Sequence, residues 1–229
     1  MNPNPPLIQM FGVTAGALRD ADAVIASGVD WTVNAGDFWA VGGSAGSGKS
    51  DFLMLAAGLL APQAGLCKIF GDDLPAFEED RLQQRLRLGF VFDGGNLFNQ
   101  LTVAENIALP LRYHRALTAA EIAARVAELL ALTELEPWAN SAPGTLGRGW
   151  RKRAGLARAL ALQPELLLLD NPLGGADARQ AAWWLDFLGR LAAGERATTL
   201  VVTADDLQPW RQHARQFARL QDGRFEVET

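Results

Sequence analysis

A glycine-rich segment between an apolar run and a helical pattern constrains the fold of this chain most. Residues 38–41 (Phe-Trp-Ala-Val) are typical of a buried strand, residues 43–50 are Gly-Ser-Ala-Gly-Ser-Gly-Lys-Ser, and a helix is predicted over residues 51–60, closed by Pro62. In this order, backbone N–H groups and a helix N-terminus can surround phosphate groups. A flexible linker is the alternative, but a linker is not expected between a buried strand and a helix. We therefore predict a phosphate-binding loop.

Composition and charge exclude several classes of protein. The 229 residues are 49% hydrophobic, with 23 glycines and 11 prolines, which suffices for a core and argues against a disordered chain. A net charge of −5 gives no overall positive field, so no nucleic-acid partner is expected. The sequence has no run of roughly 18 apolar residues that could span a membrane and no positive flank for a signal peptide. We expect a cytosolic protein.

Residues that often form metal or redox sites are scarce. The single cysteine, Cys67, excludes a disulfide framework and is expected to be a small buried hydrophobic residue. His114 and His213 are expected at the surface, because nothing in the sequence pairs either with a second ligand. Three aromatic residues near the C-terminal third are expected to pack in the core or at an interface: Trp183, Trp184 and Phe187.

Short apolar runs alternate with helical patterns along the rest of the chain. Three runs are expected to be buried parallel strands: residues 88–92, 166–169 and 200–203. Thr118 and Glu121 form a capping box before an apolar stripe at helical spacing, which predicts a helix. Residues 96 to about 142 carry no strong strand signal and are predicted to form an inserted helical lobe. The alternation predicts an α/β domain.

The side chains of Ser50 and Asp170 are expected to bind a metal ion next to the predicted phosphate site. Asp170 closes the run 166–169, where a second contact to Mg²⁺ belongs if Ser50 supplies the first; in isolation, Asp170 could be a turn or cap residue. Lys49 is expected to reach the β- and γ-phosphates. The predicted nucleotide-binding residues are Gly43, Ser44, Ala45, Gly46, Ser47, Gly48, Lys49, Ser50 and Asp51. The expected ligand is a purine nucleoside triphosphate with Mg²⁺.

Nearly the whole chain resembles the ATP-binding subunits of ABC transporters. Residues 43–50 resemble the Walker A motif of that family, and residues 88–111 resemble the segment around its Q-loop. Residues 151–170 (RKRAGLARALALQPELLLLD) resemble the signature helix and the Walker B strand, and residues 174–177 (GGAD) resemble the D-loop. Residues 94–111 are most similar to ATPases of MCE/Mla-type lipid transporters.

The resemblance implies a fold and a domain organisation. The fold is α/β, a P-loop ABC-ATPase core with a mostly parallel sheet, an antiparallel β subdomain and an inserted helical subdomain. A single ATP-binding domain, residues 1–229, would comprise a nucleotide-binding core (residues 1–95 and 160–229) and a helical subdomain (about 96–159). ATP and Mg²⁺ are the implied cofactors.

The chain departs from the family at groups that act on the terminal phosphate. Asn171 stands where the family has a glutamate that polarises the attacking water, and an amide cannot accept a proton from water. Asp93, also a candidate Mg²⁺ ligand, replaces the Q-loop glutamine, and Ala204 replaces the switch histidine. No residue is assigned a catalytic role. The resemblance therefore implies a subunit that binds Mg-ATP but is impaired in hydrolysis.

The signature loop, Gly147, Arg148 and Gly149, also departs from the family. Gly147 lacks the serine hydroxyl, and Arg148 places a large cation where a glycine permits close approach, although arginine can still pair with phosphate oxygens. The basic cluster is expected to serve helix-end electrostatics or a partner's nucleotide: Arg148, Arg151, Lys152 and Arg153. No clear aromatic residue stacks on adenine; Phe11 is the nearest candidate and Leu18 more nearly occupies its place.

The resemblance also implies partners and a location. It implies a transmembrane permease subunit and either a homodimer or a second ABC subunit, with the chain cytoplasmic and peripheral on the inner face of the cell membrane. A homodimer would turn ATP over slowly, and a heterodimer would compromise both composite sites unless Arg148 compensates. The candidate docking residues, which could equally pack the helical lobe, are Leu97, Phe98, Leu101 and Val103.

Two other functions are compatible with the sequence. One is an active ATPase with a non-standard catalytic base, for which the candidates are Asp93, Asp205 and Asp206. The other is a non-enzymatic structural or regulatory subunit of a transport complex. An ABC protein of DNA repair or translation is less compatible, because the chain has neither a long coiled-coil insertion nor a second cassette.

Overall fold

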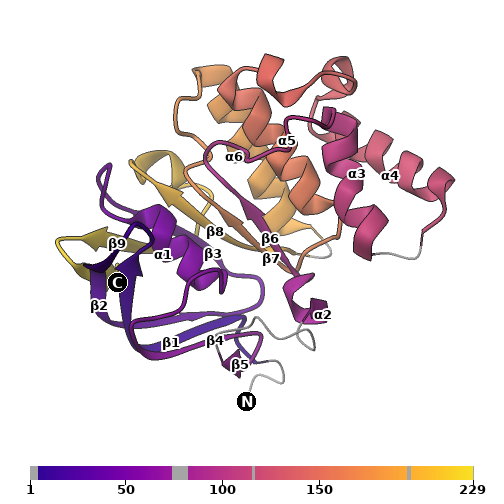
Figure 1. Ribbon diagram of the computed structural model, residues 1–229. Coiled ribbons are helices and arrows are strands. Elements are labelled where there is room, and N and C mark those ends of the chain that lie inside the picture. The colour runs from indigo at the N-terminus through magenta and orange to yellow at the C-terminus, as the bar shows by residue number, and fades with distance from the viewer. Residues whose placement is uncertain (1–4, 74–81, 115–116, 195–196, 229) are drawn as a thin grey trace.

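Two sheets and a group of helices make up the computed structural model, which describes residues 5–73, 82–114, 117–194 and 197–228 (Figure 1). The strands are β1 (Ile8–Ala17), β2 (Asp20–Val33), β3 (Phe38–Gly42), β4 (Ala64–Ile69), β5 (Asp72–Asp73), β6 (Leu88–Val91), β7 (Leu166–Leu169), β8 (Thr199–Ala204), β9 (Gln216–Gln221) and β10 (Arg224–Val227). The α-helices are α1 (Lys49–Ala56), α2 (Leu82–Arg85), α3 (Val103–His114), α4 (Ala119–Leu132), α5 (Arg148–Leu160) and α6 (Ala178–Ala193). Short 3₁₀ helices are η2 (Glu136–Trp138), η3 (Pro143–Thr145) and η4 (Gln208–Trp210).

The larger sheet has the order β10-β9-β3-β8-β7-β6, in which only β10 is antiparallel to its neighbour. Its central strands are buried and mostly apolar because both faces are covered, and the polar exceptions are Thr199 and Thr203 of β8. Phe38 and Ala40 face the core on the helical side, whereas Trp39 and Val41 face the core that includes α1. The three strands predicted from apolar runs are therefore present as β6, β7 and β8, with β7 fully buried.

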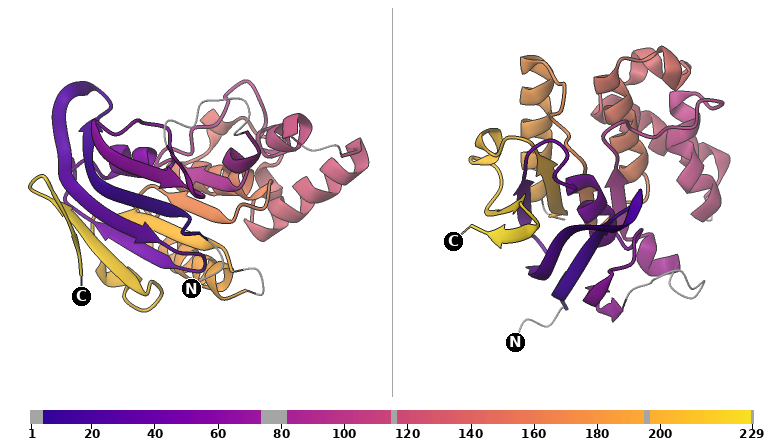
Figure 2. Two further views of the ribbon diagram at one scale, coloured as in Figure 1. Left: turned by 90° about the horizontal axis from the view of Figure 1, so that it is seen from below. Right: turned by 60° about the vertical axis from the view of Figure 1, so that its left-hand side comes forward.

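The smaller sheet, with the order β2-β1-β4-β5, is antiparallel. Figure 2 shows β1, β2 and β4 as a layer apart from the orange and yellow strands of the larger sheet. Helix α1 packs against both β1 and β8, so it lies between the two sheets. Buried aromatic residues fill this space, among them Trp31 and Phe52 with ring centroids 5.6 Å apart.

Helices α3, α4 and α5 pack on one another beside β6, and Figure 1 shows them grouped at one end of the larger sheet. The predicted capping box of α4 forms, because Thr118 accepts from the Glu121 backbone N–H and the Glu121 carboxylate accepts from Thr118. Between β6 and β7 the described residues contain only helices and loops. The α/β fold with an antiparallel sheet, a largely parallel sheet and a helical insertion is thus confirmed. The division at residues 96 and 159 stays a prediction.

Helix α1 is shorter at its end than the predicted range of 51–60. It begins at Lys49, because Gly48 adopts a left-handed conformation (φ 87°) as the N-cap. It ends at Ala56, because Gly58 has φ 71° and its N–H bonds back to the Leu55 carbonyl, which is a glycine-type helix stop.

Most of the cysteine, histidine and aromatic residues that were given no functional role lie where the sequence predicted. Cys67 is buried, and burial raises the pKa of its thiol to about 12. Trp184 and Phe187 lie in the core on the helical side. His114 is exposed, whereas His213 is half-buried, so the expectation of two surface histidines is only partly correct. No helix in the described ranges is long and apolar enough to cross a membrane.

Candidate nucleotide site

The glycine-rich loop joins the end of β3 to the start of α1. The Gly43 N–H donates to the Ala204 carbonyl at 3.2 Å, which ties the loop to the end of the adjacent strand β8. Gly46 and Gly48 have φ near +81° and +87°, which side chains rarely adopt. A Cβ on Gly43 would lie 2.5 Å from the Leu220 carbonyl oxygen. The loop conformation therefore requires glycine at these positions.

Most of the predicted nucleotide-binding residues meet around one hollow of about 370 Å³. It is lined by Ala45, Gly46, Gly48, Lys49, Ser50, Asp51, Asp93, Asp170, Asn171 and Asp205. Gly43, Ser44 and Ser47 belong to the loop but do not line the hollow. The buried Ser47 hydroxyl has no hydrogen-bond partner among the described residues. Such an orphaned polar atom fits a loop built to receive an oxygen-rich ligand.

The Lys49 ammonium group has three acceptors. It donates to the carbonyl oxygens of Gly43 and Ser44, both at 2.7 Å, and it lies 3.0 Å from Oδ1 of Asp205. The second carboxylate oxygen of Asp205 accepts from the Asn171 amide at 3.1 Å. The Asn171 side-chain amide is therefore a hydrogen-bond donor to a carboxylate.

Asp170 is oriented by a residue that the sequence did not point out. Oδ1 of Asp170 accepts from the Thr203 hydroxyl at 2.8 Å, and the same hydroxyl accepts from the Asn171 N–H at 2.9 Å. Because β7 and β8 are adjacent and parallel, their ends place Thr203 beside Asp170. The only sequence signal is that both residues follow apolar runs at strand ends.

Asp93 is engaged by two cations of α5. Its Oδ1 lies 2.6 Å from the Lys152 Nζ, and its Oδ2 contacts the Arg148 guanidinium group. Lys152 also donates to the carbonyl oxygens of Asn171 at 2.6 Å and Gly174 at 2.8 Å. Burial lowers the pKa of Lys152, and the Asp93 carboxylate counteracts part of this effect. The arrangement makes Asp93 an ion-pair partner, which argues against its predicted roles as Mg²⁺ ligand and base.

A close backbone approach brings α5 to the loop that carries Asp93. A Cβ on Gly155 would lie 3.0 Å from the Gly95 carbonyl oxygen, and a Cβ on Gly95 would lie 2.3 Å from the Arg151 carbonyl oxygen. Only glycine fits at this crossing. The loop after β6 and the first turns of α5 are therefore held together by shape as well as by charge.

Residues of the signature loop and of the first turns of α5 pack against other side chains of the same chain. Gly147 is the N-cap of α5 and supplies no side-chain cap, whereas a serine there could provide one. Trp150 packs on Trp138 with ring centroids 4.0 Å apart. The Arg153 guanidinium group lies 3.7 Å from the Trp183 ring centroid. Of the predicted basic cluster, Arg148, Lys152 and Arg153 thus have partners within the chain.

The hairpin between β1 and β2 reaches the start of α1. The Leu18 N–H donates to the Asp51 carboxylate at 3.1 Å, so Leu18 lies at the edge of the loop. Phe11 pairs with Leu66 in the antiparallel sheet. Of the two residues considered for adenine, Leu18 is the one brought to the site.

The residues present fit a nucleotide with a divalent cation. Phosphate groups can bind to the glycine-rich backbone, the unpaired Ser47 hydroxyl and the Lys49 ammonium group. Mg²⁺ can bind to the Ser50 hydroxyl and to the Asp170 carboxylate, which Thr203 orients. The described residues contain no group of three or more acidic, histidine or cysteine ligands that could hold a metal ion alone.

Comparisons with known proteins show the family of the chain. The sequence profile of the family described as ABC transporter matches residues 26–174. The chain is 40% identical over 181 residues to the "Sulfate/thiosulfate import ATP-binding protein CysA" of Methylococcus capsulatus, covering 78% of this chain and 51% of that protein. It is 32% identical to the "Macrolide export ATP-binding/permease protein MacB" of Nitrosomonas europaea, covering 98% of this chain and 34% of that protein. The chain spans about half the length, or less, of these relatives.

Solved structures show the same architecture. The dimeric cassette MJ0796, titled a bacterial ABC transporter cassette, matches with a TM-score of 0.85 at 31% identity, covering 97% of both chains. A second structure of MJ0796, bound to ADP and Pi, matches with the same TM-score at 30% identity. With the profile match over residues 26–174, these likenesses show that the chain belongs to the ABC transporter family, whose ATP-binding domains bind ATP with Mg²⁺.

Proposed function

We propose that this chain is the ATP-binding subunit of a membrane transporter, and that it binds Mg-ATP but hydrolyses it slowly or not at all. The observation that carries the proposal is the donor role of Asn171 at the end of β7, where its amide binds the Asp205 carboxylate. Lys49 and the loop backbone would hold the phosphates, and Ser50 and Asp170 would hold Mg²⁺. Bound Mg-ATP would supply a phosphoanhydride bond, but no described side chain at position 171 or 204 can accept a proton from water.

An active ATPase with another base is the second candidate. Asp93 is paired with Lys152 and Arg148, and Asp206 lies outside the hollow, where it accepts from the Gln208 N–H at 2.9 Å. Asp205 pairs with a single cation, Lys49, and its side chain is 54% exposed, so of the three candidates it is the one left to act as the base. This candidate predicts a magnesium-dependent turnover that Asp205→Asn removes while ATP binding persists.

Nucleotide binding is tested by calorimetric titration of the purified chain with ATP, with and without Mg²⁺. Wild type is expected to bind ATP. Lys49→Ala is expected to weaken ATP binding at least about 100-fold, because the phosphate-binding loop loses its cation. Asp170→Asn should weaken ATP binding in the presence of Mg²⁺ and leave ATP binding without Mg²⁺ unchanged. Equal binding by wild type and Lys49→Ala would contradict the proposal and support a structural or regulatory subunit.

A membrane partner is expected to dock at the exposed edge of the larger sheet. Strand β6 is the edge strand, and two hollows flank it that share Leu88 and Phe90. The second hollow includes Phe98 and Tyr113, whose side chains are 53% and 76% exposed. Of the residues predicted to dock, Val103 is instead fully buried in the helical lobe. A transmembrane permease subunit could place an amphipathic segment on this edge.

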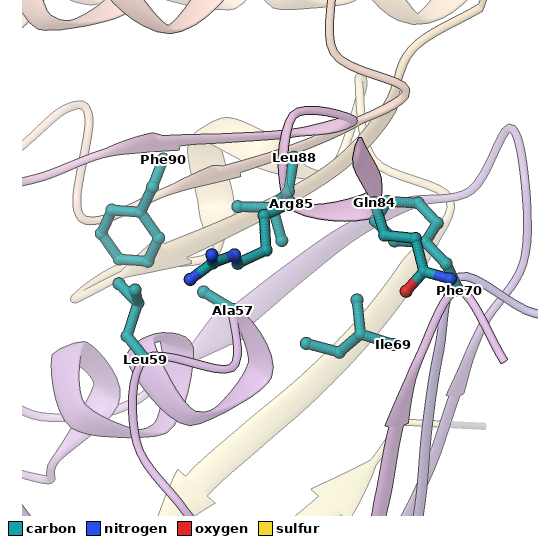
Figure 3. A pocket seen from close by; sticks show the side chains of 8 residues that line it. All are labelled: Ala57, Leu59, Ile69, Phe70, Gln84, Arg85, Leu88 and Phe90. Carbon is teal, nitrogen blue, oxygen red and sulfur yellow. The ribbon is translucent and has the colours of Figure 1, made fainter. Parts of the chain in front are cut away.

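The first hollow, about 210 Å³, lies between the end of α1, β4, α2 and β6. Figure 3 shows the Phe90 ring and the Leu59 side chain at one end and the Phe70 ring at the other. The Arg85 guanidinium group lies between Phe90 and Ala57 (Figure 3). A largely apolar hollow with one cation suits a partner segment that carries apolar side chains and a carboxylate.

Cargo and location are narrower parts of the proposal. The likeness of residues 94–111 to lipid-transport ATPases supports a lipid cargo, whereas the relatives are named for sulfate import and macrolide export. We place the chain peripherally on the inner face of the cell membrane, paired with a second copy or a second ABC subunit. Copurification with a permease from membranes, followed by lipid analysis, tests these assignments.

A further inference from the structure

The Lys49 ammonium group is saturated by its own chain. It carries three hydrogens, and it contacts three oxygens, the carbonyls of Gly43 and Ser44 and the carboxylate of Asp205. The two carbonyls belong to the loop that holds the lysine. Asp205 comes from a different segment, directly after β8, and its side chain is 54% exposed whereas that of Lys49 is 7% exposed. A new anion on Lys49 would therefore displace Asp205, the one acceptor that does not belong to the loop and whose side chain is exposed.

Asn171 makes the position of Asp205 possible. Its amide donates to Oδ2 of Asp205 at 3.1 Å, so the carboxylate bridges Lys49 and Asn171. A glutamate at position 171 would set two carboxylates at this distance, and their repulsion would drive Asp205 from the lysine. The departure from the family at position 171 thus has a second consequence besides the loss of a base.

We infer that Asp205 is a specificity-determining residue that competes with the terminal phosphate of a nucleoside triphosphate for Lys49. This inference rests on the proposed function, because it concerns the same nucleotide site. Asp205 approaches from the ends of β7 and β8, where Asp170 and Asn171 lie, whereas the loop backbone surrounds the inner phosphates. A triphosphate must therefore displace Asp205 from Lys49 when it binds, whereas a diphosphate, whose β-phosphate is held mainly by the loop backbone, leaves Asp205 in place.

The first experiment compares the affinity of wild type, Asp205→Asn and Asp206→Asn for ATP and ADP with Mg²⁺. Asp206 is the matched control, because it is the next residue, is exposed, and caps Gln208 outside the hollow. Asp205→Asn should bind ATP about three- to tenfold more tightly, with less than about a twofold change for ADP. Asp206→Asn should match wild type for both nucleotides.

A second measurement needs no nucleotide. The chain has lysines only at positions 49, 68 and 152, so acylation of each can be followed by peptide mass spectrometry. The Lys49 nitrogen must leave the Asp205 carboxylate and lose a proton to solvent before its lone pair can attack the acylating reagent, so Asp205→Asn and Asp205→Ala should raise the labelling rate of Lys49 several-fold. Lys68, whose side chain is 31% exposed, serves as the internal reference.

The outcomes separate two kinds of failure. Unchanged or weaker ATP binding by Asp205→Asn, or equal tightening for ATP and ADP, would overturn the inference and leave the proposed function standing. If no variant binds nucleotide, the proposed function fails, and the labelling rates then decide the Lys49 contact alone. An unchanged Lys49 labelling rate in both Asp205 variants would overturn the contact itself.

Discussion

Asn171 determines the chemistry of the candidate site through both its backbone and its side chain. Its φ is 45°, a left-handed conformation that asparagine tolerates better than most residues. Its N–H binds Thr203, its carbonyl accepts from Lys152, and its amide binds Asp205. The side chain is therefore a donor fixed within a network, and it offers no base to an attacking water.

Replacing Asn171 by glutamate is expected to restore little hydrolysis. The new carboxylate would face Asp205, and Ala204 would still offer no polar group to the terminal phosphate. We expect less than about a tenfold rise in phosphate release at saturating Mg-ATP, a small part of the 10²- to 10⁴-fold that general-base catalysis typically contributes. Turnover typical of an active ATPase in this single variant would contradict the role given to the other departures.

Thr203→Val tests how Asp170 is held. Valine matches threonine in shape but donates no hydrogen bond, so Asp170 loses its 2.8 Å contact and we expect Mg²⁺-dependent ATP affinity to fall about five- to tenfold. Thr199→Val is the control, because Thr199 is also buried in β8 and its hydroxyl accepts from the Gly36 N–H far from the hollow. Calorimetric titration with and without Mg²⁺ checks this. Equal losses in both variants would mean a general loss of stability.

Only part of the candidate site could be predicted from the sequence, namely the residues whose spacing within a single segment is informative. The loop around Lys49 and the carboxylate of Asp170 follow from spacing within one segment each. Thr203 binds Asp170, which lies 33 positions away in the sequence, and Lys152 binds Asn171, which lies 19 positions away. Those contacts depend on which strands are neighbours, which a single sequence does not encode locally.

At the scale of elements, the helical lobe is held by well-capped helices. Helix α4 has its predicted capping box, and α3 has a second one that we did not predict, in which the Thr102 N–H donates to Glu105 at 2.8 Å. Thr102 also accepts from the Glu105 N–H at 3.2 Å. The T-x-x-E spacing of Thr102 and Glu105 is visible in the sequence, and it precedes the apolar positions of α3 as the spacing of Thr118 and Glu121 precedes those of α4.

The two capping glutamates predict a loss of stability in acid. Hydrogen bonds from Thr102 and Thr118, backbone first and then side chain, hold the pKa values of Glu105 and Glu121 below their usual range. A lowered pKa in the folded state contributes stability that is complete above the usual glutamate pKa and is lost as the pH falls through the lowered value. The double variant Glu105→Gln and Glu121→Gln should therefore show a smaller acid-side decline.

Urea midpoints measured between pH 7 and pH 3 test this dependence. The control is Glu226→Gln, an exposed residue of β10 that caps no helix. Wild type and the control should decline in parallel, whereas the double variant should have a flatter profile. Three parallel profiles would contradict the assigned role of the capping carboxylates.

At the scale of the whole molecule, the loop after β6 contributes residues both to the proposed docking edge and to the nucleotide hollow. Asp93 in this loop reaches the hollow, and Phe98 in the same loop reaches the edge. The fold class could be predicted from the sequence because β7 and the middle of β8 are short apolar runs that alternate with helical patterns. The strand order β3-β8-β7-β6 could not, because it is set by packing between segments far apart in sequence.

Phe98→Asp, alone and with Leu101→Asp, is expected to release the chain from its membrane partner. The substitution places a charge on an exposed apolar side chain at the edge, while the nucleotide hollow contains neither residue. Recovery of the chain with membranes should fall at least about tenfold, with ATP affinity within twofold of wild type. Leu132→Asp, at an exposed leucine of α4 away from β6, is the control. Retained association of the Phe98 variants would place the docking surface elsewhere.

The central claim, that nucleotide binding is retained while hydrolysis is impaired, is tested most directly by phosphate release at a Mg-ATP concentration that saturates the chain. Occupancy is first verified by titration, and Lys49→Ala serves as the blank. We expect wild type to be saturated and to release phosphate at the rate of the blank. Phosphate release well above the blank, at the same occupancy, would contradict the claim and make Asp205 the next residue to change.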